Sequence, residues 1–134
     1  MPALLDATVL LAARPGWNAL TARLDERSEE EFYISTITAA ELLQTALMSS
    51  EVRKRTKRVA FVEAVLDQFP LLSLDRLVAR MHAQIQTQLA EDDERVALHD
   101  SWLAATCLAH GLSLITLDAR ELGKVRGLEI ERWS

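Results

Sequence analysis

The stretch "DSWLAATCLAHGLSLITLDARELG", residues 100–123, predicts a helix, a buried strand and a turn in succession. Its first eleven residues are mostly helix formers, and they are followed by Gly111, a residue type that commonly closes helices. Residues 112–117 form a short apolar run that is typical of a buried strand. A helix that leads directly into a buried strand is typical of sheets covered by helices on both faces.

Strands and helices alternate along the rest of the chain in the same way. We expect strands at 3–6, 32–36, directly after Pro70, and at 128–133. We expect a helix that breaks near "RPG" at 14–16, and further helices over 17–27, 38–48, 51–68 and 75–90. The predicted fold is a three-layer α/β/α sandwich with a mainly parallel central sheet, built as a single domain over residues 1–134.

The composition indicates the compartment. With one cysteine, Cys107, the chain has no internal disulfide, and no signal-peptide pattern opens it, so we expect a reducing cytoplasm. The longest apolar runs are far shorter than the roughly 20 residues of a membrane helix, so we expect no membrane association.

Charge is distributed unevenly along the chain. A formal net charge of −5 does not by itself point to a nucleic-acid binder. The run "EVRKRTKR" at 51–58 is strongly basic, and it forms either a solvated helix face or a surface that contacts phosphates. The candidates for phosphate contact are Arg53, Lys54, Lys57 and Arg58, with Lys124 and Arg126 as second candidates.

Four carboxylates stand at the ends of predicted elements, and ligands of such sheets bind beyond the carboxyl ends of the strands. Asp6 and Asp118 follow strands, whereas Asp100 opens a helix and Glu41 lies one turn into another. Three of these acids also have a purely structural explanation. Glu41 would form a capping box with Thr38, Asp100 would be the N-cap of its helix, and Asp118 would start a turn. Capping explains Asp6 least well, because apolar residues surround it.

Carboxylates that converge in one crevice repel each other unless cations neutralise them. Mg²⁺ or Mn²⁺ is the natural partner, because hard divalent ions take oxygen ligands and promote phosphodiester hydrolysis. Zinc is disfavoured, because Cys107 and the three histidines lack the spacing of a zinc site. Those histidines are His82, His99 and His110.

Three segments resemble the PIN-domain nucleases, and among them the VapC-type toxin ribonucleases. They are "LLDATVLL" at 4–11, "ISTITAAEL" at 34–42 and "HDSWLAATCLAHGLSLITLDARELGKVRGLEI" at 99–130, and they occur in the family's order. Residues 49–95 carry no matching motif. Ala7 replaces the more usual Thr and Leu122 the usual Phe, but neither change removes a carboxylate.

The resemblance implies both a site and an activity. It implies a Mg²⁺- or Mn²⁺-dependent endoribonuclease acting on structured RNA such as tRNA or rRNA, with the basic run then contacting RNA. It further implies a homodimer, inhibited by a small antitoxin protein that covers the groove. The family's acidic metal ligands match four residues of this chain by position, namely Asp6, Glu41, Asp100 and Asp118. Thr116 matches the hydroxyl residue beside them, and Thr8 stands at a place where the family often has Ser or Asn.

Other functions remain open at this stage. A haloacid-dehalogenase-type phosphatase requires a second Asp two residues after the first, where this chain has Thr8. A receiver domain requires an acidic pair at the first strand, which the chain also lacks. The remaining alternatives are a PIN-like scaffold that binds RNA or protein without cleavage, and an RNA-processing nuclease outside a toxin–antitoxin pair.

Overall fold

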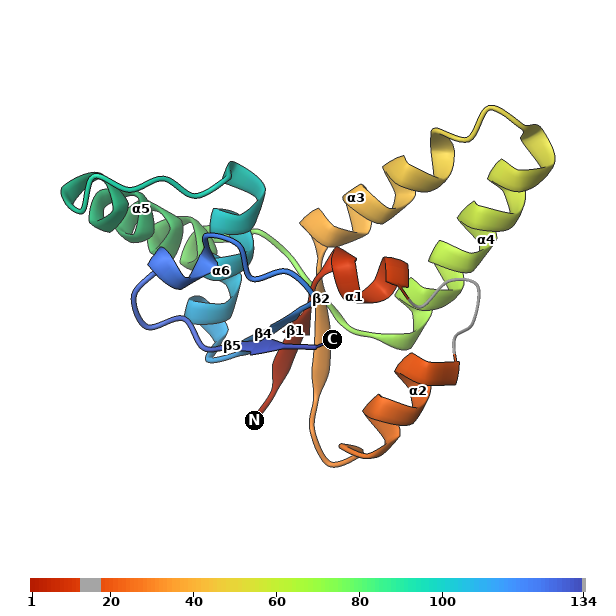
Figure 1. Ribbon diagram of the computed structural model, residues 1–134, viewed down its shortest axis with the longest axis horizontal. Helices are drawn as coiled ribbons and strands as arrows, with labels where there is room; N and C mark the ends of the chain where they lie inside the picture. Colours follow the sequence, from red (N-terminus) through yellow and green to blue (C-terminus); the bar gives the residue numbers. More distant parts are fainter. Residues whose placement is uncertain (13–17, 134) are drawn as a thin grey trace.

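Within residues 1–12 and 18–133, which the computed structural model describes, one parallel sheet has the strand order β3-β2-β1-β4-β5 (Figure 1). Every strand pair in it is parallel, which confirms the predicted sheet. The strands are β1 (Ala3–Leu5), β2 (Phe32–Ser35), β3 (Leu71–Leu72), β4 (Ser113–Thr116) and β5 (Ile130–Arg132).

Helices cover both faces of the sheet, as predicted. Side chains of β1 alternate between two hydrophobic cores, because successive residues of a strand point to opposite faces. Ala3 and Leu5 pack into the core formed with α1 to α4, and Leu4 into the core formed with α5 and α6. The helices are α1 (Ala7–Ala12), α2 (Asn18–Asp25), α3 (Thr36–Leu47), α4 (Val52–Gln68), α5 (Arg76–Glu91) and α6 (Leu98–His110), followed by the 3₁₀ helix η1 (Leu122–Lys124).

Local hydrogen bonds decide where the helices begin and end. The Ser35 hydroxyl accepts a hydrogen bond from Ile37 N at 3.2 Å, so α3 begins two residues before the predicted start at residue 38. Gly111 adopts the left-handed conformation with φ +67° and closes α6, as predicted. The predicted break at 14–16 lies outside the described residues.

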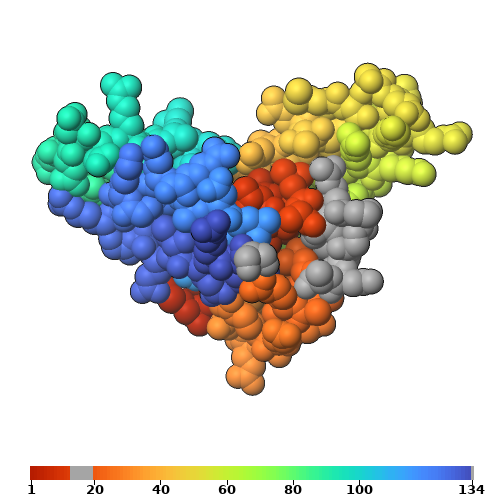
Figure 2. All heavy atoms as spheres, in the orientation of Figure 1, coloured from red at the N-terminus to blue at the C-terminus, as the bar shows by residue number. Residues whose placement is uncertain are grey.

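Helices α3 and α4 project from the sheet as an arm, defined here as residues 36–68 (Figure 1). The pair α5 and α6 forms a lobe on the opposite side, and the surface between arm and lobe is hollowed above α1 (Figure 2). None of the described helices is long and apolar enough to span a bilayer.

Candidate active site

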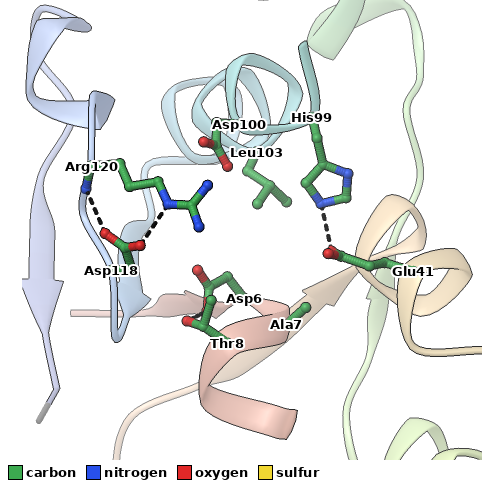
Figure 3. A pocket seen from close by; sticks show the side chains of 9 residues that line it. All are labelled: Asp6, Ala7, Thr8, Glu41, His99, Asp100, Leu103, Asp118 and Arg120. Carbon is green, nitrogen blue, oxygen red and sulfur yellow. Dashed lines mark hydrogen bonds and ion pairs between the residues drawn. The ribbon is translucent and has the colours of Figure 1, made fainter. Parts of the chain in front are cut away.

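A cavity of about 120 Å³ opens at the carboxyl edge of the sheet. It lies beside the ends of β1 and β4, where the connections turn to opposite sides of the sheet, the usual ligand position in open α/β folds. All four predicted acids face it. The lining residues are Asp6, Ala7, Thr8, Glu41, His99, Asp100, Leu103, Asp118 and Arg120 (Figure 3).

Strand pairing and helix direction explain why these acids meet. Leu5 of β1 pairs with Ile115 of β4, so the residues after the two strands emerge together at one edge. Helix α6 runs back against the strands before leading into β4, which brings its first turn and Asp100 to that edge. Glu41 reaches the cavity from the second turn of α3.

Hydrogen bonds hold the buried carboxylate of Asp6, which is only 6% exposed. Its Oδ1 accepts hydrogen bonds from Thr8 Oγ1 at 2.6 Å and from the backbone N of Val9 at 3.2 Å. Its Oδ2 accepts a hydrogen bond from the Thr116 hydroxyl. The contact with Val9 N is an N-cap of α1, so the expectation that capping explains Asp6 least well was wrong.

Thr116 lies behind the cavity rather than on its wall. The side chain is fully buried, and its hydroxyl also accepts a hydrogen bond from Asp118 N at 3.1 Å. Thr8 does line the cavity, and its hydroxyl accepts a hydrogen bond from Leu117 N at 3.0 Å. The two hydroxyl groups therefore connect β4 to Asp6.

The capping alternatives for Glu41 and Asp100 are wrong. Ser35, not Thr38, caps α3, and the Glu41 carboxylate lies 2.8 Å from Nε2 of His99 across the cavity. Nε2 of His99 has no hydrogen-bond partner in the described part of the chain, so the contact acts as a charge interaction whenever His99 is protonated. Asp100 is the third residue of α6 rather than its N-cap, a position where the helix dipole favours negative charge.

Asp118 forms the turn expected of it, and its partner is Arg120. The backbone N of Arg120 donates to Oδ1 of Asp118 at 3.1 Å, and its Nε donates to Oδ2 at 2.6 Å. These hydrogen bonds hold the pKa of the Asp118 carboxyl below its usual range. Arg120 has a positive φ of 39°, an uncommon conformation for a residue other than glycine.

The site is rich in negative charge at its centre. Burial raises the pKa of the Asp100 carboxyl, the nearby carboxylates of Asp6 and Asp118 raise it further, and the positive charge of Arg120, joined by that of His99 when the imidazole is protonated, opposes the shift. A bound cation would relieve this repulsion.

The donor set fits a hard divalent ion, although the side chains are not arranged around one. Among residues 1–12 and 18–133, no three acidic, histidine or cysteine side chains are gathered closely enough to enclose an ion. Glu41 and Asp118 instead contact His99 and Arg120. Four carboxylates around one cavity nevertheless suit Mg²⁺, which keeps several waters and contacts one or two carboxylates directly.

Arg120 was not among the residues chosen from the sequence. The signal was a cation two residues after an acid at a strand end, a spacing that allows the side chains to pair across a turn. The basic run lies at the far end of the arm, around the start of α4, and none of Arg53, Lys54, Lys57 and Arg58 lines the cavity. Lys124 and Arg126 pair with acids outside the cavity lining.

Comparisons with known proteins agree with this architecture. A family model described as PIN domain matches residues 3–128. Ribonuclease VapC5 of Mycobacterium tuberculosis is 34% identical over 115 residues, which covers 85% of this chain and 81% of that protein. The tRNA(fMet)-specific endonuclease VapC of Shigella flexneri is 30% identical over 101 residues, covering 75% and 74%. The DNA-bound VapBC crystal structure from Salmonella typhimurium superposes with a TM-score of 0.88 at 25% identity, covering 100% of both chains.

Proposed function

The chain belongs to the PIN-domain family with the VapC ribonucleases, and we propose that it is a divalent-metal-dependent endoribonuclease, the toxin of a toxin–antitoxin pair. The observation that carries the proposal is the gathering of Asp6, Glu41, Asp100 and Asp118 around one cavity at the carboxyl edge of the sheet. These acids come from four separate segments of the chain, so local capping alone does not account for their meeting. Mg²⁺ or Mn²⁺ is the proposed cofactor.

The residues of the site divide into ligands and supports. Asp6 and Asp100 are the proposed principal ligands, because Asp6 is held by hydrogen bonds and Asp100 faces it within the cavity. Glu41 and Asp118 lie at the two sides of the cavity and would contribute through the water shell (Figure 3). Thr116 acts as a positioning residue, because its buried hydroxyl contacts Asp6 and the backbone of Asp118.

A divalent ion bound there supplies activation of a water molecule and charge stabilisation of the leaving oxygen. The protein contributes orientation: packed β1 and β4 hold Asp6 and the start of the Asp118 turn in place. The hollow between the arm and the α5–α6 lobe (Figure 2) is the proposed path by which an RNA strand reaches the acids.

The proposed partners follow from the same family membership. One relative is named for its action on tRNA(fMet), which supports structured RNA such as tRNA or rRNA as the substrate class. The VapBC structure from Salmonella typhimurium supports a cognate antitoxin as the protein partner. We also propose a homodimer and a cytoplasmic location, with the basic residues Arg53, Lys54, Lys57 and Arg58 contacting RNA along the arm.

Cleavage of a labelled tRNA or rRNA fragment in Mg²⁺ or Mn²⁺ tests the proposal. We expect cleavage by the purified protein, and loss of cleavage both with EDTA and in Asp100→Asn, which removes a charge while keeping the side-chain size. Cleavage that survives both treatments would refute metal-dependent hydrolysis at this site. RNA binding without cleavage in any metal would instead favour the non-catalytic scaffold.

A further inference from the structure

Arg120 places a positive charge inside the acidic cavity. Its guanidinium group points into the space between Asp100 and Asp6, while its Nε donates to Asp118 at 2.6 Å (Figure 3). The guanidinium charge also acts on Asp100. Arg120 is therefore a counter-ion for the acidic side chains of the cavity.

The ion pair between the side chains of Arg120 and Asp118 is weak enough to break easily. The Arg120 side chain is 71% exposed and that of Asp118 46% exposed, and ion pairs so accessible to water contribute little stability. The backbone hydrogen bond from Arg120 N to Asp118 Oδ1 holds the turn independently of the guanidinium group. The side chain is thus able to leave the carboxylate while the turn keeps its shape.

Charge balance predicts what happens when a cation arrives. A divalent ion on the carboxylates takes over the role of the guanidinium as counter-charge, and two cations in one cavity repel each other. The guanidinium group then needs another anion at the cavity mouth. An RNA phosphate entering the site is such an anion, and arginine binds phosphate oxygens through paired N–H groups.

We propose that Arg120 is a phosphate-contacting residue of this site, and that it exchanges Asp118 for a backbone phosphate of the RNA when a divalent cation binds. The inference rests on the proposed nuclease function and adds to it a substrate contact. Arg120 then competes with the metal ion and binds the RNA. Removing its side chain should therefore raise the affinity for the metal ion and lower the affinity for RNA.

Two binding measurements test this opposition. Calorimetric titration with Mn²⁺ alone is performed on the wild type, Arg120→Ala, Arg120→Lys and Arg126→Ala. Arg126 is the matched control, because it lies six residues after Arg120 and its side chain is 68% exposed. It pairs with Asp92, and neither residue lines the cavity. Fluorescence anisotropy then measures binding of a labelled RNA hairpin with Mn²⁺ at several salt concentrations, and a denaturing gel checks that the RNA is intact.

The expected results have opposite signs. Arg120→Ala should bind Mn²⁺ more tightly, by up to about five-fold, because an exposed competing cation is removed. The same variant should bind RNA more weakly, with the slope of log affinity against log salt reduced by roughly one. Arg120→Lys should recover the salt slope in part, and Arg126→Ala should leave Mn²⁺ affinity unchanged.

Each failure has a distinct meaning. Weaker Mn²⁺ binding by Arg120→Ala, or an unchanged RNA salt slope, would overturn the exchange while leaving the nuclease proposal intact. A wild-type protein that binds no Mn²⁺ would overturn the metal-dependent function and the exchange together. A tighter Mn²⁺ site in Arg126→Ala as well would show that general surface charge, not the Arg120 contact, sets the affinity.

Discussion

The side-chain hydroxyl of Thr116 donates a hydrogen bond to Oδ2 of Asp6, although the two residues lie 110 positions apart in the chain. The same hydroxyl accepts a hydrogen bond from the backbone N of Asp118. One buried oxygen thus connects two of the four acids of the proposed site. Because Thr116 is fully buried, water cannot readily replace this contact.

We expect Thr116→Val, which has nearly the same shape but lacks the hydroxyl, to destabilise the fold and to slow RNA cleavage. Loss of a buried hydrogen bond to a charged acceptor lowers the free energy of unfolding by about 1.5–3 kcal/mol. Urea unfolding and single-turnover cleavage measure the two effects. Thr116→Ser is the control, because it keeps the hydroxyl and should retain more activity. Wild-type cleavage by the valine variant would argue against a positioning role.

Gly111→Ala should lower the free energy of unfolding by about 1–2 kcal/mol, because alanine is strained in the left-handed conformation that closes α6. The added methyl meets no atom within 4 Å, so backbone strain alone should account for the loss. Gly123→Ala is the matched control, since it also has open space and lacks a positive φ. Equal urea midpoints for the two variants would contradict this explanation.

Cys107 should react very slowly with thiol reagents while the protein is folded. Burial raises the pKa of its thiol, and the negative charge of Asp6 raises it further. At pH 8 the reactive thiolate is therefore scarce, and the buried sulfur is inaccessible. We expect a disulfide reagent to label the folded protein roughly ten-fold or more slowly than the protein unfolded in urea. The absorbance of the released thiol measures the rate. Rapid stoichiometric labelling of the folded protein would contradict the prediction.

Removing two cations from the arm should weaken RNA binding without changing Mn²⁺ affinity. Arg53 and Lys57 are exposed and four residues apart on α4, so they share one face of the helix. We expect Arg53→Ala with Lys57→Ala to reduce both the affinity for an RNA hairpin and its salt dependence. The matched control is Arg76→Ala with Arg80→Ala, an exposed pair with the same spacing on α5. Equal effects from both pairs would mark the basic run as a merely solvated face.

Much of the fold was predictable from short-range patterns. Apolar runs at residues 3–5 and 112–117 identified the central strands, and the glycine at 111 identified the end of α6, because both signals depend on neighbouring residues. The order of strands and helices then favoured a parallel sheet. The boundaries were less accurate at α3 and α6. The Ser35 hydroxyl caps α3 before the segment with the clearest helical composition, and α6 begins at Leu98, two residues before the predicted start.

By itself, the sequence determined which elements form and that Asp6 and Asp118 follow strands, since periodicity and composition act over a few residues. Only the tertiary structure decided the distant partners of the acids, which are Thr116 for Asp6 and His99 for Glu41. Arg120, the partner of Asp118, lies only two residues away in the chain. Strand register brings β1 beside β4, and helix packing brings α3 opposite α6. These long-range placements gather the four carboxylates around one cavity. The direction of the Arg120 side chain then places its positive charge among them.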